Sequence, residues 1–182
     1  MRESSGSPPE FVKYVVTLTW DRLRPRKTLS DSHLPTRVPR RFTCTTKHAL
    51  LAALAREQHI NAQLVLGIYE MSERNTPGVG HVLSRYGLSY IPEAHCHLRY
   101  KGQRIDVTGV PTGASPIEGF LYEEPIAVEQ IGTYKNDVHK RFLGNWITRT
   151  EVVRSRNLEE VWRIREECIA ALGAGEYANP DS

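Results

Sequence analysis

The stretch CTTKHALLAALAREQHINAQLVLG, residues 44–67, decides the fold. In its first half, leucines repeat on one face of a helix while charged side chains fall on the other, and threonines at the front suit helix capping. The apolar run that follows is typical of a buried strand. We therefore predict a largely buried helix over 43–58, which begins close to Cys44, and then a strand over 62–71.

A second informative stretch, EAHCHLRYKGQRIDVTG, covers residues 93–109. Apolar and polar residues alternate on both sides of a Lys-Gly step, which predicts two strands, over 94–100 and 103–109. Glycine tolerates a positive φ, so Lys101-Gly102 is suited to a two-residue turn. We predict an antiparallel hairpin here.

This hairpin brings two histidines near one aspartate. With a two-residue turn, His97 lies directly opposite Asp106, and His95 lies two residues along on the same face. Opposite side chains are about 5 Å apart and diagonal ones about 7–8 Å apart, so either histidine can reach the carboxylate, and the simple register favours His97. A carboxylate in this place fixes the tautomer of an imidazole and stabilises its charged form. The alternative is an ordinary ion pair on the surface.

Cys44 is the candidate nucleophile because it stands at the start of the predicted helix. An ordinary thiol has a pKa of about 8.5 and is a poor nucleophile at neutral pH. The N–H groups and aligned peptide dipoles at a helix N-terminus favour an anion, and an adjacent imidazolium stabilises a thiolate further. The alternative is that Cys44 is a small buried residue that begins a helix.

The rest of the chain completes a single domain. A strand is predicted over 11–20, with an amphipathic helix as the alternative. Two C-terminal helices are predicted within 133–149 and 157–175, the second with an Asn157 cap and a stop at Gly173. The fold class is therefore α+β, with one domain over 11–175, a disordered tail over 1–10 and a C-terminal tail over 176–182.

Composition excludes several classes of protein. The chain has 182 residues, 40% of them apolar and 25% charged, with a formal charge of +3 and a pI of about 8.8. This is far from the dense Lys/Arg excess of a nucleic-acid binder, so no nucleic acid is expected as a partner. No run of about 18 apolar residues occurs, so no membrane is expected either. The opening residues do not resemble a secretory signal, and three cysteines do not suggest a disulfide framework, so we expect the cytoplasm.

Metal binding is the main rival to a catalytic cysteine. The residues that could take part are Cys44, His95, Cys96 and His97. A structural zinc site needs paired ligands on two knuckles, whereas this chain has one cluster, and strand alternation turns Cys96 away from both histidines. We expect no metal and no cofactor, and we expect His48 and His59 at the surface or the edge of the core.

Taken together, the segments CTTKHALLAALAREQHINAQLVLG and HCHLRYKGQRIDVTG resemble the transglutaminase-like, or papain-like cysteine, superfamily over roughly residues 42–109. That family has a cysteine at the start of an Ala/Leu-rich helix, then a strand, a His-x-aromatic strand, a Gly turn and a strand with Asp. The resemblance assigns Cys44 as nucleophile, His95 as catalytic imidazole and Asp106 as the orienting carboxylate. His97 then stands at the position of the aromatic residue in the family's His-x-aromatic motif, and it remains the alternative catalytic histidine.

The resemblance implies a papain/transglutaminase-like core, in which the cysteine-bearing helix packs on a small antiparallel sheet that carries the histidine and aspartate. It also implies a thiol acyltransferase or amide hydrolase with a Cys-His-Asp catalytic triad, acting on a peptide or a small-molecule amide. A member that has lost activity can instead serve as a protein-binding module, which is the alternative function.

Overall fold

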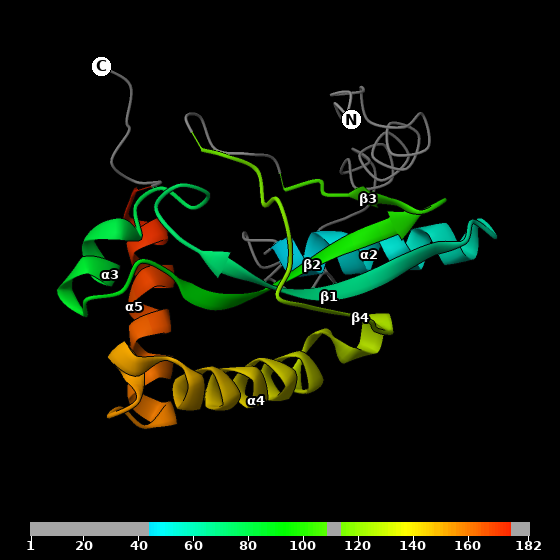
Figure 1. Ribbon diagram of the computed structural model, residues 1–182. Coiled ribbons are helices and arrows are strands. Elements are labelled where there is room, and N and C mark those ends of the chain that lie inside the picture. Colours follow the sequence, from blue (N-terminus) through cyan, green and yellow to red (C-terminus); the bar gives the residue numbers. More distant parts are fainter. Residues whose placement is uncertain (1–43, 109–113, 176–182) are drawn as a thin grey trace, which may run out of the picture.

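A four-stranded antiparallel sheet with helices packed against it forms the fold of the computed structural model, which describes residues 44–108 and 114–175 (Figure 1). The strand order is β3-β2-β1-β4. The strands are β1 (Ala62–Met71), β2 (Ile91–Tyr100), β3 (Gln103–Ile105) and β4 (Tyr122–Pro125). The predicted α+β class, with a small antiparallel sheet and C-terminal helices, is confirmed.

The first helix of the described chain, α2 (Cys44–Glu57), begins at the predicted cysteine and leads into β1. Its alanine- and leucine-rich face packs on apolar side chains of β1 and β2, with Ala52, Leu66 and Cys96 among the buried members of this core. Small alanine side chains let the helix lie close to the sheet, while the larger leucines fill the space around them. The predicted helix and the predicted strand over 62–71 are both confirmed.

The hairpin of β2 and β3 turns at Lys101 and Gly102, which both have positive φ. Positive φ at both central residues is typical of a type I′ turn, and the register that follows pairs Leu98 with Ile105. The turn and register are as predicted, but the strand predicted over 103–109 is too long, since β3 ends at Ile105. Beyond that residue the chain leaves the ladder and makes contact with α2 instead.

The two faces of β2 have different surroundings. Cys96 packs in the core under α2, whereas His95 and His97 point to the opposite face, as strand alternation requires. There the segment that leads into β4 crosses the sheet (Figure 1), and its Phe120 ring lies directly over Gly67 of β1. A side chain in place of Gly67 would collide with that ring, so the glycine permits this close approach.

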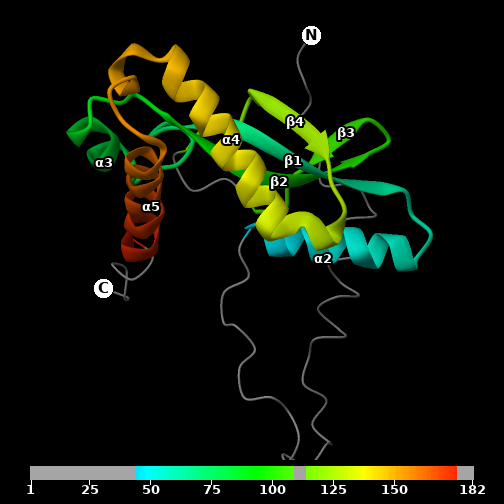
Figure 2. The ribbon, with the colours of Figure 1, turned by 90° about the horizontal axis from the view of Figure 1, so that it is seen from below.

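The remaining helices pack around the end of β1 and the start of β2. They are the short α3 (Gly80–Arg85), α4 (Thr133–Arg149) and α5 (Leu158–Gly175), with single turns of 3₁₀ helix at Val128–Ile131 and Glu151–Val153. Seen from below, α4 crosses the sheet, and the 3₁₀ turn Val128–Ile131 just before it lies beside α2 (Figure 2). The Asn157 cap is confirmed, since its side chain accepts from the Glu160 N–H. The stop at Gly173 is wrong, because the helix continues to Gly175; glycine weakens a helix without forbidding it.

A buried ion pair fastens α5 to β2. Arg165 donates from Nε and from a terminal nitrogen to the two carboxylate oxygens of Glu93, at 2.7 and 2.6 Å. Such a bidentate pair fixes both direction and distance, so it sets how the helix lies against the strand.

Some predictions concern other parts of the chain. The strand over 11–20 and the tails over 1–10 and 176–182 lie outside the described residues. Within the described part, no helix is both long enough and apolar enough to cross a bilayer.

Candidate functional site

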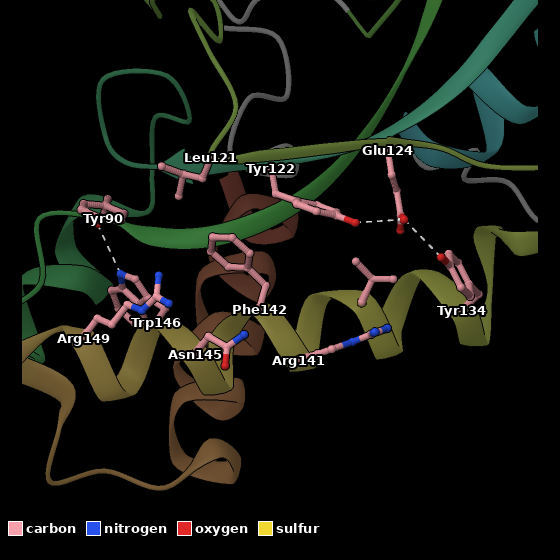
Figure 3. Close-up of a pocket in the computed structure, with 11 residues that line it drawn as sticks. Tyr90, Leu121, Tyr122, Glu124, Tyr134, Arg141, Phe142, Asn145, Trp146 and Arg149 are labelled. Atoms are coloured by element: carbon pink, nitrogen blue, oxygen red, sulfur yellow. Dashed lines mark hydrogen bonds between the residues drawn. The ribbon is translucent and has the colours of Figure 1, made fainter.

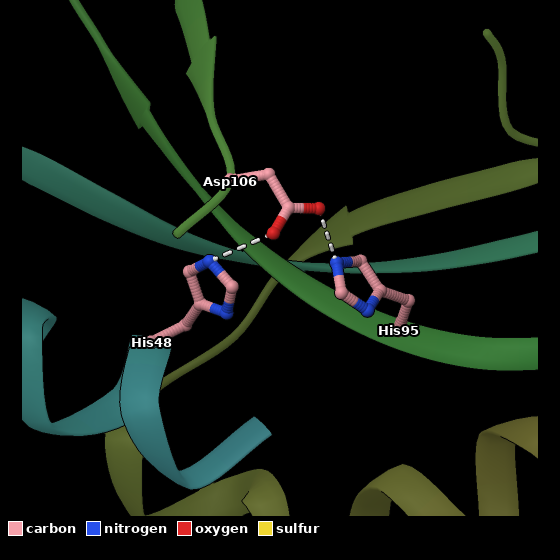
Figure 4. Close-up of side chains that lie close together, drawn as sticks. All are labelled: His48, His95 and Asp106. Atoms are coloured by element: carbon pink, nitrogen blue, oxygen red, sulfur yellow. Dashed lines mark hydrogen bonds and ion pairs between the residues drawn. The ribbon is translucent and has the colours of Figure 1, made fainter. Parts of the chain in front are cut away.

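Three side chains from three separate elements meet beside the sheet: His48 of α2, His95 of β2 and Asp106 from the turn after β3 (Figure 4). His95 Nε2 lies 2.6 Å from Asp106 Oδ2. His48 Nε2 lies 3.4 Å from the other carboxylate oxygen, Oδ1. The two imidazoles are buried in the described structure, while 29% of the Asp106 side chain is exposed. The carboxylate thus lies between two histidines at the edge of the core.

The Asp106 carboxylate is held on both oxygens. Thr108 donates to Oδ1 from its backbone N–H, at 3.0 Å, and also from its hydroxyl. Burial by itself would raise the pKa of Asp106, but the hydrogen bonds that the His95 ring and the Thr108 hydroxyl donate to it outweigh burial and hold that pKa below its usual range. Asp106 is therefore a carboxylate at neutral pH, and it accepts a hydrogen bond from the Nε2–H group of His95.

Of the two candidate histidines, His95 is the one that bonds to Asp106. The regular register would place Asp106 opposite His97, but β3 has ended by then, so the aspartate is free of the ladder and its side chain reaches His95. The His95 ring is enclosed by aromatic neighbours. Tyr69 and His48 meet it edge to face, with ring centroids 6.1 and 5.6 Å away, and Phe120 lies parallel to it at 6.5 Å.

His97 has a different environment. Its ring is fully buried and stacks on Phe120 with centroids 4.9 Å apart. Its Nε2 lies 3.2 Å from Glu123 Oε1, but without hydrogen-bonding geometry, and neither ring nitrogen has a hydrogen bond to any described residue. Burial, together with the positive charges of His95 and Arg104, lowers the pKa of His97 to about 3. His97 is thus a neutral core residue at physiological pH.

The backbone of Cys44 begins α2, as the sequence predicts. Position 44 precedes position 48 by four residues, so both lie on one face of the helix, about 6 Å apart along its axis. The His48 side chain points into the cluster with Asp106 (Figure 4). The first turn of α2 contains no acidic side chain, so nothing within the helix offsets the positive end of its dipole.

His48 is the member of this cluster that the sequence prediction missed. It was expected at the surface or the edge of the core, but it is fully buried and lies at the centre of the site. Its Nε2 accepts the backbone N–H of Val107 at 3.0 Å. The signal for it was available, because a histidine four residues after a candidate nucleophile at a helix start lies on the same face of that helix. His59, by contrast, is exposed as expected.

The same three side chains are a possible set of metal ligands, since their donor atoms lie within 4.8 Å of one another. Two histidines and a carboxylate suit zinc or iron. However, His48 Nε2 already accepts the Val107 N–H. Ligands of one tetrahedral zinc, each bound at about 2.0–2.1 Å, lie roughly 3.3 Å apart, well beyond the 2.6 Å between His95 and Asp106. The arrangement is that of a hydrogen-bonded network.

A separate cavity of about 500 Å³ lies between β4 and α4 (Figure 3). Its walls are largely aromatic, and Tyr122 and Tyr134 both donate to Glu124 there, at 3.0 and 3.2 Å. The lining also includes Arg141 and Arg149. None of the three clustered side chains belongs to this cavity, so it is a second concave feature rather than part of the site.

Comparison of the chain with models of protein families, with curated proteins and with solved structures finds no match in any of the three.

Proposed function

We propose that this protein is a cysteine-dependent acyltransferase or amide hydrolase of the transglutaminase-like kind, with Cys44 as nucleophile, His95 as general acid and base, and Asp106 as the carboxylate that orients His95. The observation that carries the proposal is the 2.6 Å hydrogen bond between His95 and Asp106, which lies beside the cysteine-bearing helix. A nucleophile, a base and an oriented partner for that base are the three parts that covalent acyl transfer needs.

The chemistry follows from which ring nitrogen Asp106 engages. Asp106 accepts a hydrogen bond from the Nε2–H group of His95. His95 Nδ1 is therefore the atom that exchanges protons with the substrate and the thiol. In the proposed reaction, Nδ1 takes the proton of the Cys44 thiol, and the sulfur attacks a carbonyl carbon. The tetrahedral intermediate collapses when the His95 imidazolium gives its proton to the leaving amine, and a thioester remains on Cys44.

The thioester is then passed to an acceptor. His95 takes a proton from water, which gives hydrolysis, or from an amine, which gives transamidation, and it returns that proton to the sulfur when the thioester bond breaks. The start of α2 favours the anionic form of a thiol at position 44, and the Cys44 N–H is the natural first donor to the oxyanion. The proposed substrates are a peptide or a small-molecule amide.

The architecture also supports this proposal. A helix that begins at the cysteine packs on an antiparallel sheet, and neighbouring parts of that sheet supply the histidine and the aspartate. This is the arrangement expected of a papain/transglutaminase-like core, and we propose that the fold is of this kind.

The second candidate function is a catalytically inactive domain that binds another protein. The cavity between β4 and α4 favours it, since Leu121, Tyr122 and Tyr134 on its walls are exposed large side chains. Exposed aromatic side chains around a hollow are typical of binding surfaces. The two functions make different demands on Cys44, because only the enzyme needs an activated thiolate.

The test is the rate at which iodoacetamide alkylates Cys44 at pH 6, followed by peptide mass spectrometry so that Cys96 and Cys168 are counted separately. We expect Cys44 to react much faster than a free thiol, and we expect His95→Ala to abolish this advantage. The matched control is His81→Ala, an exposed histidine on α3, which should leave the rate unchanged. A wild-type rate no faster than that of a free thiol would favour the binding module.

A further inference from the structure

We infer that His48 is a positioning residue of this site, which fastens the Asp106 turn to the helix that bears the nucleophile and thereby directs the carboxylate to His95. The effect of His48 on catalysis rests on the proposed function. The contacts that carry it are independent of any reaction.

The first contact is between His48 and the backbone that follows Asp106. The Val107 N–H donates to His48 Nε2 at 3.0 Å, and the imidazole is fully buried in the described structure. An imidazole nitrogen that accepts an N–H carries no proton of its own, so neutral His48 holds its proton on Nδ1. His48 thus acts on the turn as a hydrogen-bond acceptor.

The place of this contact in the chain matters. The ladder with β2 ends at Ile105, so strand pairing holds the backbone up to that residue and no further. Asp106 comes next, and its side chain is held locally by Thr108, two residues along, which fixes the shape of the turn but not where the turn lies. The His48 contact ties this turn to another element of the fold.

The direction of the carboxylate follows from these restraints. Oδ1 faces Thr108 and lies 3.4 Å from His48, which leaves Oδ2 toward His95. The two imidazoles also meet edge to face, with ring centroids 5.6 Å apart (Figure 4). His48 therefore touches both partners of the His95–Asp106 pair and restricts where each can move.

The element that supplies His48 is the same helix that begins at Cys44. Because a helix is stiff, a restraint at position 48 fixes the distance from the Asp106 turn to position 44, one turn away. His48 couples the nucleophile to the base and its partner, although it transfers no proton to the substrate. A displacement of about 1 Å between reacting groups can lower a rate by about 10²-fold, so such a coupling is consequential.

The experiment compares His48→Gln with His48→Asn. The Gln amide reaches the place of the imidazole Nε2, so its oxygen can accept the Val107 N–H, whereas the Asn amide is one methylene too short. The two side chains are otherwise alike in chemistry, which separates a lost contact from a general effect of burying an amide. His59→Gln, an exposed position just after α2, is the matched control.

Two readouts are measured on the full-length protein. The first is the pH profile of Cys44 alkylation by iodoacetamide: His48→Gln should keep most of the wild-type rate at pH 6, and His48→Asn should lose up to about 100-fold. The second is the ¹⁵N NMR spectrum of the His95 ring: the Nε2–H tautomer should stay fixed in wild type and in His48→Gln, and should become mixed in His48→Asn.

The outcomes separate this inference from the proposed function. If wild-type Cys44 reacts as a free thiol, the proposed function fails, and the His95 tautomer still decides whether His48 positions Asp106. If the folded Gln and Asn variants share the wild-type tautomer and alkylation profile, the inference is overturned. The inference would also be overturned if both variants, shown to be folded by circular dichroism, lost the fixed Nε2–H tautomer of His95 to the same extent. The reach of the side chain at position 48 would then not matter.

Discussion

His95 Nε2 lies 2.6 Å from Asp106 Oδ2, at the point where the β2–β3 hairpin has stopped pairing. A carboxylate that is fixed by the ladder would face His97, and the early end of β3 is what lets it turn to His95 instead. The hydrogen bond between His95 and Asp106 thus depends on β3 being only three residues long.

Replacing Asp106 by Asn should remove the charge that fixes His95 while keeping the size of the side chain. The amide can present its NH₂ group to His95 and favour the wrong tautomer, so we expect the alkylation rate of Cys44 at pH 6 to fall about 10²-fold or more. Asp137→Asn, on the exposed side of α4, is the control and should have no effect. An unchanged rate in a folded Asp106→Asn protein would remove Asp106 from the proposed triad.

Replacing Gly67 by Ala should push Phe120 away from the histidines. The added Cβ would collide with Phe120 Cδ1, so the ring must move and its stacking on His97 is lost. We expect a loss of about 1–3 kcal/mol in the free energy of unfolding, measured by urea denaturation.

The matched control for Gly67→Ala is Gly144→Ala in α4, where an added Cβ meets nothing within 4 Å. That change should stabilise the protein by about 0.5–1 kcal/mol, since alanine favours a helix more than glycine does. Combining Gly67→Ala with Phe120→Ala should cost less than the sum of the two single changes. Strict additivity would contradict the close approach of the ring to Gly67.

The stability of the protein should fall as the pH falls, in part because of His97. Its pKa is about 3 in the folded protein, against about 6.5 when unfolded, so the unfolded chain binds the proton more readily. The contribution is therefore complete above about pH 6.5 and is lost as the pH falls toward 3, at about 1.4 kcal/mol per pH unit, or roughly 3 kcal/mol between pH 7 and pH 4.

Urea denaturation at several pH values measures this effect. His97→Leu should flatten the dependence by that amount, whereas His81→Leu, at an exposed site, should leave it as in wild type. His139, whose pKa burial also lowers, adds to the wild-type slope in the same direction and is present in both variants, so the difference isolates His97. Equal slopes for wild type and His97→Leu would contradict the buried, neutral state of this ring.

The buried pair of Glu93 and Arg165 should behave differently from a surface pair. Arg165→Leu leaves the Glu93 carboxylate buried without its partner, and we expect a loss of about 3–5 kcal/mol in unfolding free energy. Adding Glu93→Leu should restore much of it. For Arg74 and Glu118, an exposed pair 2.9 Å apart, the same substitutions should change stability by less than about 1 kcal/mol. Similar losses for the two pairs would show that the first does not fasten α5 to β2.

The features that sequence predicted well are those set by local chemistry. The start of α2, the strand over 62–71, the turn at Lys101-Gly102 and the Asn157 cap each depend on residues within a few positions of one another. Alternation along β2 likewise placed Cys96 on the face opposite the two histidines.

The features that sequence missed depend on contacts between distant segments. The end of β3 is set by Val107, whose N–H bonds to a helix residue 59 positions earlier, and this is what places Asp106 beside His95. The burial of His48 follows from the same contact. The strand β4 pairs with β1 rather than with a sequence neighbour, so no local pattern marked it. The spacing of the residues left Asp106 a choice between His95 and His97, and the family resemblance chose His95, which is the histidine that bonds to Asp106.

The most direct test of the central claim is whether an acyl group is transferred to and from Cys44. The protein is mixed with p-nitrophenyl acetate, quenched in acid, and mapped by peptide mass spectrometry. We predict an acetyl thioester on Cys44 that disappears with time in water, or faster when a primary amine is added, and that does not form in His95→Ala. No adduct on Cys44, or an equal yield in wild type and His95→Ala, would contradict the assignment of Cys44, His95 and Asp106 to acyl transfer.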